Sequence, residues 1–417
     1  MNITKITQLG ALSFAMCAAT SFAASNDALL EILVKKGVLT SAEAEDVRTE
    51  LAAAEAEAAK DQPVYVQAKG KAVESIKLTG RFHFAYDNIS NDGDYDERDR
   101  FYFRRLYLGA EAKFAHDTYA KLIGNFGGED GDIDLDKAVV GWKADPMFEV
   151  EAGYTKVPFG LYETTSSSKI KTVERSIANR LFVEDDGLRL GGRHTGLFAE
   201  GDLGAGFSYG AAAVTSSPSN DRDDKSNAEK DGLGFFGRVQ WESDETEVGE
   251  FMVGADLAHM ENGSNYTNDG SGGNSGDGDL TAFGIHGSYD IGDFTISAEG
   301  LFGTVEDQIV AGDDVDVTGF TITPSYKITD KWEIVAAYSV VDTDGGFLLD
   351  ADDLVRRSGV GETFDEGTSY YLGFNYYIIG NDLKLSGGYE FAEFEDGDGG
   401  ADDVEIDAFR LRLQALF

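Results

Sequence analysis

From about residue 76 to the end of the chain, apolar and polar side chains alternate with a period of two. Successive side chains of a β-strand leave opposite faces, so this pattern predicts strands that separate two different environments. The last nine residues, FRLRLQALF (409–417), show it most clearly. Aromatic and aliphatic side chains lie on one face, and Arg410, Arg412 and Gln414 lie on the other.

Such strands fit a transmembrane β-barrel, whose outer face contacts lipid and whose lumen is wet. Arginines on the lipid face would be costly, so the face with Arg410 and Arg412 should be the lumen. The mean hydropathy of −0.27 argues against a bundle of membrane helices, which needs runs of about 20 apolar residues. The fold class predicted is all-β, a 16-stranded antiparallel transmembrane β-barrel with a short N-terminal periplasmic helical segment.

Sixteen segments have this alternation, an even number as in single-chain bacterial barrels. The predicted strands are 76–87, 101–114, 118–126, 134–143, 147–156, 194–201, 205–214, 233–242, 249–260, 279–289, 293–304, 316–327, 331–341, 367–378, 381–393 and 404–417. Short and long connections alternate between them, as expected for tight periplasmic turns and longer extracellular loops. With an even number of strands, both ends of the barrel lie on the periplasmic side.

The N-terminal residues predict export. Lys5, an apolar run and Ser21-Phe22-Ala23 form a secretory signal peptide over residues 1–23. Residues 24–75 then predict a periplasmic helical segment and linker, in which apolar residues recur at helical spacing. A short trimeric coiled coil and a loosely ordered tail are both compatible with this stretch.

A secreted β-sandwich or β-propeller would need a filled apolar core. The inward faces instead carry Lys121, Asn125, Lys137, Glu149 and Glu151, which suit a water-filled lumen. The barrel is therefore expected to occupy residues 76–417.

The third extracellular connection, residues 157–193, is the longest. A loop of that length in this position can fold inward and narrow the pore, where its charges would set ion preference through the local potential. Its cationic candidates for pore-lining and anion-binding residues are Lys169, Lys171, Arg175, Arg180 and Arg189.

Four motifs resemble one known family. They are FYFRRLYLGAEAKF (101–114), K-x-PFG (156–160), TSSS (165–168) and VERS (173–176), and together they are similar to the phosphate-selective porins O and P. The resemblance implies a homotrimeric outer-membrane channel for anions such as phosphate or polyphosphate, with arginines and lysines along its lumen.

The resemblance adds Arg105, in the FRR motif, and Lys121, on the next strand, to the pore-lining and anion-binding candidates. Because Arg104 and Arg105 are adjacent, alternation predicts that they face opposite sides. Arg105 is expected in the lumen and Arg104 near the outer boundary of the membrane.

The charge distribution leaves the selectivity open. Residues 98–193 carry 15 Lys and Arg against 16 Asp and Glu, whereas residues 194–417 carry 11 against 45. The cations are thus concentrated where the family places its anion path, but an acidic remainder could repel anions. Much of that remainder lies in Asp- and Gly-rich loops, where salt would screen it.

Other functional classes have little support. The five histidines are scattered without a close ligand pair, and the acidic loops lack the EF-hand spacing, so no metal site and no cofactor are expected. No Ser, His and carboxylate set suggests an enzyme. A formal net charge of −41 argues against binding to nucleic acid.

The sequence therefore predicts a homotrimeric porin of the bacterial outer membrane that passes small hydrophilic solutes by diffusion, with anions of the phosphate class as the favoured cargo. Its other expected partners are outer-membrane lipid and lipopolysaccharide. Two alternatives remain: a general or cation-preferring porin, and a structural envelope protein that tethers the outer membrane through its periplasmic helices.

Overall fold

The computed structural model describes Lys36 and residues 73–127, 133–183, 187–216, 232–246, 248–263, 278–306, 314–343, 349–395 and 402–417. The predicted signal peptide lies outside these residues. So does the predicted helical segment, apart from Lys36 and residues 73–75, and the last three belong to the first strand. Among the described residues, no helix has the length and apolar character needed to cross a membrane.

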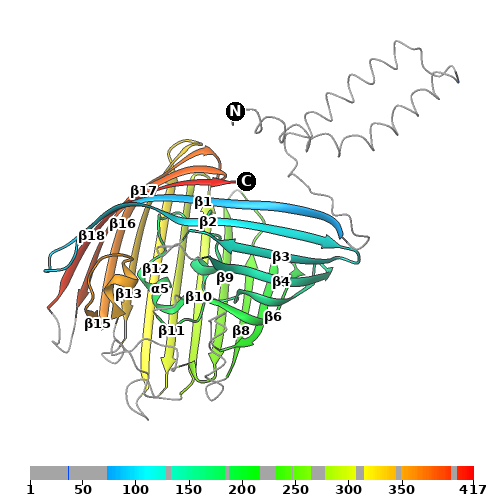
Figure 1. The fold of residues 1–417 in the computed structure, drawn as a ribbon, viewed down its shortest axis with the longest axis horizontal. Coiled ribbons are helices and arrows are strands. Elements are labelled where there is room, and N and C mark those ends of the chain that lie inside the picture. The colour runs from blue at the N-terminus through cyan, green and yellow to red at the C-terminus, as the bar shows by residue number, and fades with distance from the viewer. Residues whose placement is uncertain are drawn as a thin grey trace, which may run out of the picture. The chain divides into compact units, whose positions relative to one another are not determined.

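Within the described residues, sixteen antiparallel strands close into one barrel, which confirms the predicted class (Figure 1). Each predicted segment coincides with one strand to within a few residues. The barrel strands are β1 (Val73–Asn91), β2 (Arg98–Phe114), β3 (Thr118–Asn125), β4 (Asp134–Asp145), β5 (Phe148–Lys156), β6 (Arg193–Gly204), β7 (Phe207–Thr215), β8 (Leu233–Glu242), β9 (Glu250–Met260), β10 (Leu280–Ile291), β11 (Phe294–Val305), β12 (Val315–Lys327), β13 (Trp332–Asp342), β16 (Glu366–Ile379), β17 (Leu383–Glu395) and β18 (Val404–Leu416).

The first and last strands close the barrel. β1 pairs with β18 from Arg81 opposite Leu416 to Asn91 opposite Ile406. Two further bonds extend this seam, from the Gly80 amide to the Phe417 carbonyl (2.7 Å) and from the Phe417 amide to the Gly80 carbonyl (3.1 Å). Because β1 and β18 pair with each other, neither strand is left as an open sheet edge along this seam.

Side chains alternate across the wall as expected. In β18, Phe409 and Leu413 are 38% and 39% exposed, whereas Arg410, Arg412 and Gln414 are buried on the other face. The outward face of the barrel also carries aromatic clusters, such as Phe84 stacked on Phe101. The two faces therefore meet different surroundings, as a membrane barrel requires.

A β-bulge changes the predicted orientation of the FRR arginines. His83 pairs with Arg105 and Phe84 with Phe103, so Arg104 is an extra residue that opposes no single partner. The bulge shifts the alternation by one position, and both arginines face inward. Arg104 forms hydrogen bonds with Glu174 of the third long loop, so the prediction that it lies at the outer membrane boundary is wrong.

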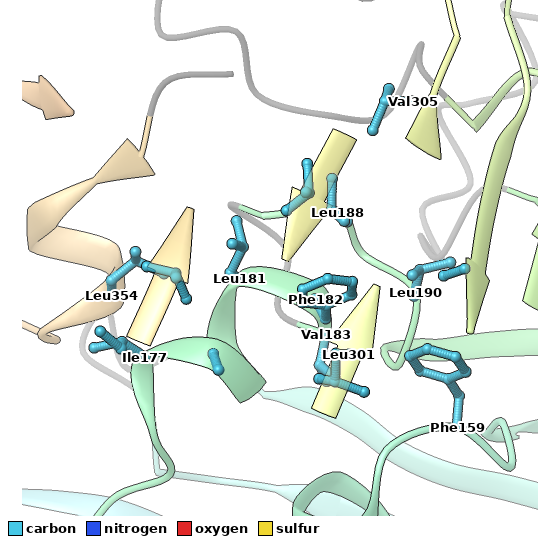
Figure 2. Close-up of a cluster of buried hydrophobic side chains, with 14 of the residues drawn as sticks. Phe159, Ile177, Leu181, Phe182, Val183, Leu188, Leu190, Leu301, Val305 and Leu354 are labelled. Carbon is cyan, nitrogen blue, oxygen red and sulfur yellow. The ribbon is translucent and has the colours of Figure 1, made fainter. Parts of the chain in front are cut away.

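The loop between β5 and β6, residues 157–192 and called loop 3 below, contains the helices α4 (Leu161–Thr164) and α5 (Ile177–Val183). Every residue of α5 is buried. In Figure 2, Leu181, Phe182 and Leu188 gather with Leu301 of β11 in an apolar cluster. Burying these side chains stabilises loop 3 against the inner wall, at about 1.5–3 kcal/mol for each large side chain.

A second long loop, residues 343–365 and called loop 7 below, also has internal structure. It contains the helix α6 (Ala351–Leu354) and the paired two-residue strands β14 (Leu349–Asp350) and β15 (Thr363–Phe364). Asp350 caps α6 by accepting from the Asp352 amide at 2.9 Å. Leu354 of α6 belongs to the same buried apolar cluster as α5, so the two loops pack together.

Gly319 of β12 permits the close approach of α5. A Cβ atom at this position would lie 3.0 Å from the Ala178 side chain and 3.1 Å from the Phe182 ring.

We expect Gly319→Val to displace α5 and to lower the free energy of unfolding by about 1–3 kcal/mol, the usual effect of overpacking. Gly237→Val on β8 is the matched control, because nothing lies within 4 Å of that Cβ position. Thermal unfolding of the two variants checks this, and equal midpoints would contradict it.

Candidate functional site

Two cationic side chains and one amide side chain of β17 and β18 hold the backbone of loop 3. Lys384 donates to the Ser168 carbonyl at 3.1 Å, and Gln414 donates to the same oxygen at 3.1 Å. Arg412 donates to the carbonyls of Val173 and Thr172. These contacts satisfy carbonyl groups that would otherwise be buried without a partner.

Two carboxylates on the opposite part of the wall hold the beginning of loop 3. The amide of Gly160 donates to Asp256 of β9 at 2.9 Å, and the amide of Leu161 donates to Glu299 of β11. Arg238 of β8 forms two hydrogen bonds with Asp256, at 2.6 and 2.7 Å. Loop 3 therefore contacts strands that are far apart around the barrel.

Arg175 braces loop 3 from within. Its guanidinium donates to the carbonyls of Tyr162 (2.8 Å), Glu163 (3.3 Å) and Thr165 (3.1 Å), and it pairs with the Glu163 carboxylate at 3.1 Å. Burial raises the pKa of Glu163, but Arg175 and Lys156 lower it more, so the net pKa lies below the ordinary value. The predicted pore-lining residue Arg175 is thus mostly engaged in holding the shape of the loop.

One group of charged residues lies where loop 3 faces strands β1 and β4–β6, and we call it the lumen cluster. Arg193 pairs with Asp136 and also donates to its carbonyl at 2.7 Å. Lys156 pairs with Glu163, and Arg81 donates to the hydroxyls of Ser167 (2.6 Å) and Ser166 (3.1 Å). The charged members of the lumen cluster are Arg81, Asp136, Lys156, Glu163, Arg175 and Arg193.

The lumen cluster contains four basic side chains and two carboxylates among the described residues. The charges of Asp136, Arg175 and Arg193 all act on Arg81 of β1. Side chains from β1, β4, β6 and loop 3 are therefore close to one another in this cluster. The side chains of Lys156 and Arg193 remain 28% and 26% exposed. The cluster can therefore attract an anion without enclosing it.

The other predicted site residues are spread over the lumen. Lys121 lies 3.9 Å from both Glu111 and Glu151, and Lys171 pairs with Glu333 of β13. Lys169 is exposed, and Arg189 has a left-handed backbone with φ of 57°. Neither of these two is among the members of the lumen cluster.

Arg105 and Arg180 are covered rather than exposed to the open lumen. They are 6% and 1% exposed, and Arg180 donates to the Leu354 carbonyl of loop 7. Burial lowers the pKa of Arg180 to about 10, against the opposing effect of Glu390 and Glu174. These two arginines lie beneath the loops and do not belong to the lumen cluster.

Three members of the lumen cluster were absent from the predicted anion-binding set: Arg81, Lys156 and Arg193. Alternation could have identified Arg81, because Leu78 and Phe82 occupy the opposite face of β1. Lys156 stands in the K-x-PFG motif, and Arg193 ends the long loop, so both were visible in the sequence. What the sequence did not give was the contact of loop 3 with these three residues.

A closed sixteen-stranded barrel with an internal loop and a charged lumen defines a porin of the outer membrane. The family model for phosphate-selective porin O and P matches residues 76–417, and the chain belongs to that family. This confirms the resemblance that the four motifs predicted.

Solved structures share the fold at low sequence identity. The chain is similar to the anion-selective porin from Comamonas acidovorans, with 14% identity and a TM-score of 0.59 over 82% of this chain and 99% of that one. It is also similar to the channel DcaP of Acinetobacter baumannii (13% identity, TM-score 0.55, 84% and 99% covered). A third similar structure is OmpT of Vibrio cholerae in its trimer form, with 14% identity and a TM-score of 0.51 over 81% of this chain and 98% of that one.

A curated relative covers a smaller part of the chain. An uncharacterized protein of Aquifex aeolicus (strain VF5) is 29% identical over 185 residues, which is 39% of this chain and 41% of that protein.

The bracing role of Arg175 generates a prediction. Arg175→Met removes the donors to three carbonyls and one partner of the buried Glu163, so it should destabilise loop 3 by about 3–5 kcal/mol, as for a broken buried ion pair. Limited proteolysis of the purified barrel should then cleave within loop 3 faster than in the native protein. Lys169→Met, on the exposed side of the same loop, should behave as the native protein does. Equal cleavage rates for all three would contradict the bracing role.

Proposed function

We propose that this porin passes small anions, with inorganic phosphate as the favoured cargo, through the part of the lumen that loop 3 leaves open beside β1 and β4–β6. The observation that carries the proposal is the lumen cluster, in which four basic side chains outnumber two carboxylates. The family's description and the anion-selective structural relative support the same class of cargo.

Charge and hydrogen bonding would act together on a passing anion. Guanidinium and ammonium groups can replace part of the water around phosphate oxygens, and Arg offers two donors in a planar fork. The hydroxyls of Ser166 and Ser167, already bonded to Arg81, add further polar groups at the same level of the pore. Each contact is weak because Asp136 and Glu163 share the cations, and weak sites permit release.

We further propose that the chain assembles as a homotrimer. The outward face of β1 and β2 carries a group of aromatic rings in mutual contact, among them Phe82, Phe84 and Phe103. Aromatic side chains of this kind are enriched at interfaces between subunits. The similar porin of Vibrio cholerae has been solved in a trimer form, which supports the same assembly here.

A general or cation-preferring pore is the second candidate. Residues 194–417 carry a large excess of carboxylates. If these groups dominated the potential at the mouth, they would attract cations and exclude anions at low salt. The sign of the reversal potential in a salt gradient separates the two candidates.

Planar-bilayer recording in a KCl gradient, followed by titration with phosphate, tests the proposal. We expect an anion-signed reversal potential and a chloride current that phosphate reduces. Cation-signed reversal without a phosphate effect would instead establish the second candidate.

Arg193→Gln should raise the phosphate concentration that halves the chloride current by about tenfold, since it removes one charge-assisted contact. Lys331→Gln, in the exposed turn between β12 and β13, is the matched control and should leave the titration unchanged. A native titration curve for Arg193→Gln would remove Arg193 from the anion path.

A further inference from the structure

Four side chains of neighbouring strands meet beneath the first turn of loop 3, and we call them the loop 3 anchor. They are Arg238 of β8, Asp256 of β9, His286 of β10 and Glu299 of β11. Arg238 lies opposite Asp256 in the register of β8 and β9, and His286 lies opposite Glu299 in that of β10 and β11. Side chains directly opposite each other on paired strands are neighbours, so the anchor is one continuous group on the lumen wall.

The anchor holds the short helix α4 at both of its ends. At the beginning of α4, Asp256 accepts from the amide of Gly160 at 2.9 Å, and Glu299 accepts from the amide of Leu161. At its end, a guanidinium nitrogen of the anchor donates to the hydroxyl of Thr164 at 2.6 Å. The position of α4 on the wall therefore depends on these side chains.

The helix α4 in turn carries a member of the lumen cluster. Glu163 of α4 pairs with Lys156 and with Arg175. If α4 moves, Glu163 moves with it, and the arrangement of charges in the lumen cluster changes. The anchor thus acts on the lumen cluster through the backbone of α4.

The two carboxylates of the anchor differ in how their charge is balanced. Arg238 forms two hydrogen bonds with Asp256, at 2.6 and 2.7 Å. Among the described residues, Glu299 accepts only from the backbone of loop 3, and its Oε2 has no hydrogen-bond partner. Glu299 is nevertheless only 2% exposed. An ionised carboxylate that is buried in this way is costly, because neither water nor a paired cation compensates its charge.

A buried histidine adjoins both carboxylates. Within the part of the chain that the structure describes, neither ring nitrogen of His286 has a hydrogen-bond partner. Its Nδ1 lies 3.4 Å from Oδ2 of Asp256, a contact that is an ion pair only when the ring is protonated. Gly254 leaves room for the ring, since a Cβ atom there would lie 2.3 Å from Nε2. The imidazole is therefore placed where it can take up a proton beside two carboxylates.

The anchor lacks one positive charge. Asp256 and Glu299 carry two negative charges and Arg238 carries one positive charge, so the net charge is −1 while His286 is neutral. One proton on Glu299 or on His286 makes the buried group neutral. Because these groups interact closely, such a proton belongs to the group as a whole rather than to one residue.

Loop 3 brings two further titratable groups to the anchor, and neither supplies the missing charge. The hydroxyl of Tyr162 is neutral and donates to Thr323 of β12 at 3.0 Å. Glu163 is itself a carboxylate, and its partners are the cations of the lumen cluster. A proton is therefore the simplest way to balance the anchor.

We infer that the loop 3 anchor takes up one proton, shared by Glu299 and His286, and that this proton fixes α4 to the wall of the barrel. With the proton, the buried group is neutral and α4 is held firmly. Without it, the uncompensated charge is relieved only when water enters between α4 and the wall, and α4 becomes mobile. The constriction therefore responds to pH. The inference does not rest on the proposed anion passage, because loop 3 lies in the lumen of a pore of either selectivity.

The direction of the pH dependence follows from the number of bound protons. Above about pH 7, an unfolded chain holds no proton on an exposed glutamate and few on an exposed histidine. The folded anchor holds one proton, so the stability that it contributes falls as the pH rises.

Thermal unfolding of the purified porin between about pH 5 and about pH 9 tests this. Glu299→Gln needs no proton, so its unfolding midpoint should exceed the native one by an amount that grows as the pH rises. Asp256→Asn breaks the pair with Arg238 and should lower the midpoint at every pH. Asp293→Asn, in the exposed turn between β10 and β11, is the control and should keep the native pH profile. A midpoint of Glu299→Gln below the native one at every pH would overturn the inference, since Glu299 would then act as an ionised acceptor.

Bilayer recording of the native pore in symmetric KCl decides the matter if Glu299→Gln does not fold. Fluctuations of the open-channel current should increase from about pH 5 to about pH 9, because α4 becomes mobile as the anchor loses its proton. Asp293→Asn should show the same increase, and Asp256→Asn should fluctuate at both ends of the range. Native fluctuations that stay constant or decrease as the pH rises would overturn the inference. The sign of the reversal potential, which tests the proposed anion passage, does not enter this measurement.

Discussion

The hydrogen bonds between lumen-facing side chains and the backbone of loop 3 are the interaction on which the rest of this structure depends. A 36-residue connection could not stay inside a wet barrel on apolar contacts alone, because its carbonyl and amide groups need partners. Lys384, Arg412 and Gln414 supply donors from one part of the wall. Asp256 and Glu299 supply acceptors from another.

This arrangement divides the cations of the barrel into two kinds. Those that hold loop 3 or lie beneath loop 7 are buried and engaged by the protein itself, as Arg175 and Arg412 are. Apart from Arg175, which belongs to both sets, the cations of the lumen cluster stay partly exposed, as Lys156 and Arg193 do. The number of arginines in the lumen therefore overstates how many are available to a passing anion, and selectivity depends on a small subset.

Most of the fold was predictable because the period of two is read directly from neighbouring residues. All sixteen strands follow from it, and β18 shows why: lipid on one side and water on the other leave little freedom in the residue types. The error at Arg104 has an equally local cause, since a bulge inserts one residue and shifts the alternation without a distinctive sequence.

The candidate site was less predictable, because it depends on contacts between residues far apart in the chain. Alternation states that Arg105 faces inward, but it does not state that loops 3 and 7 cover it. For the same reason the sequence named Arg175 as a candidate without revealing that its donors serve the carbonyls of loop 3. The motif matches identified the family, and the distances assigned the arginines to different tasks.

If solutes pass beside Arg193, as we propose, a reagent in the lumen should reach this position but not the wall behind loop 3. The chain has a single cysteine, Cys17, which precedes the barrel, so cysteines introduced into the strands can be labelled selectively. The most direct measurement is the bilayer current of Arg193→Cys and Ser386→Cys during exposure to a negatively charged methanethiosulfonate reagent. We expect the current through Arg193→Cys to fall and that through Ser386→Cys, whose native side chain is 1% exposed, to be unaffected. Rapid loss of current in Ser386→Cys with none in Arg193→Cys would contradict it.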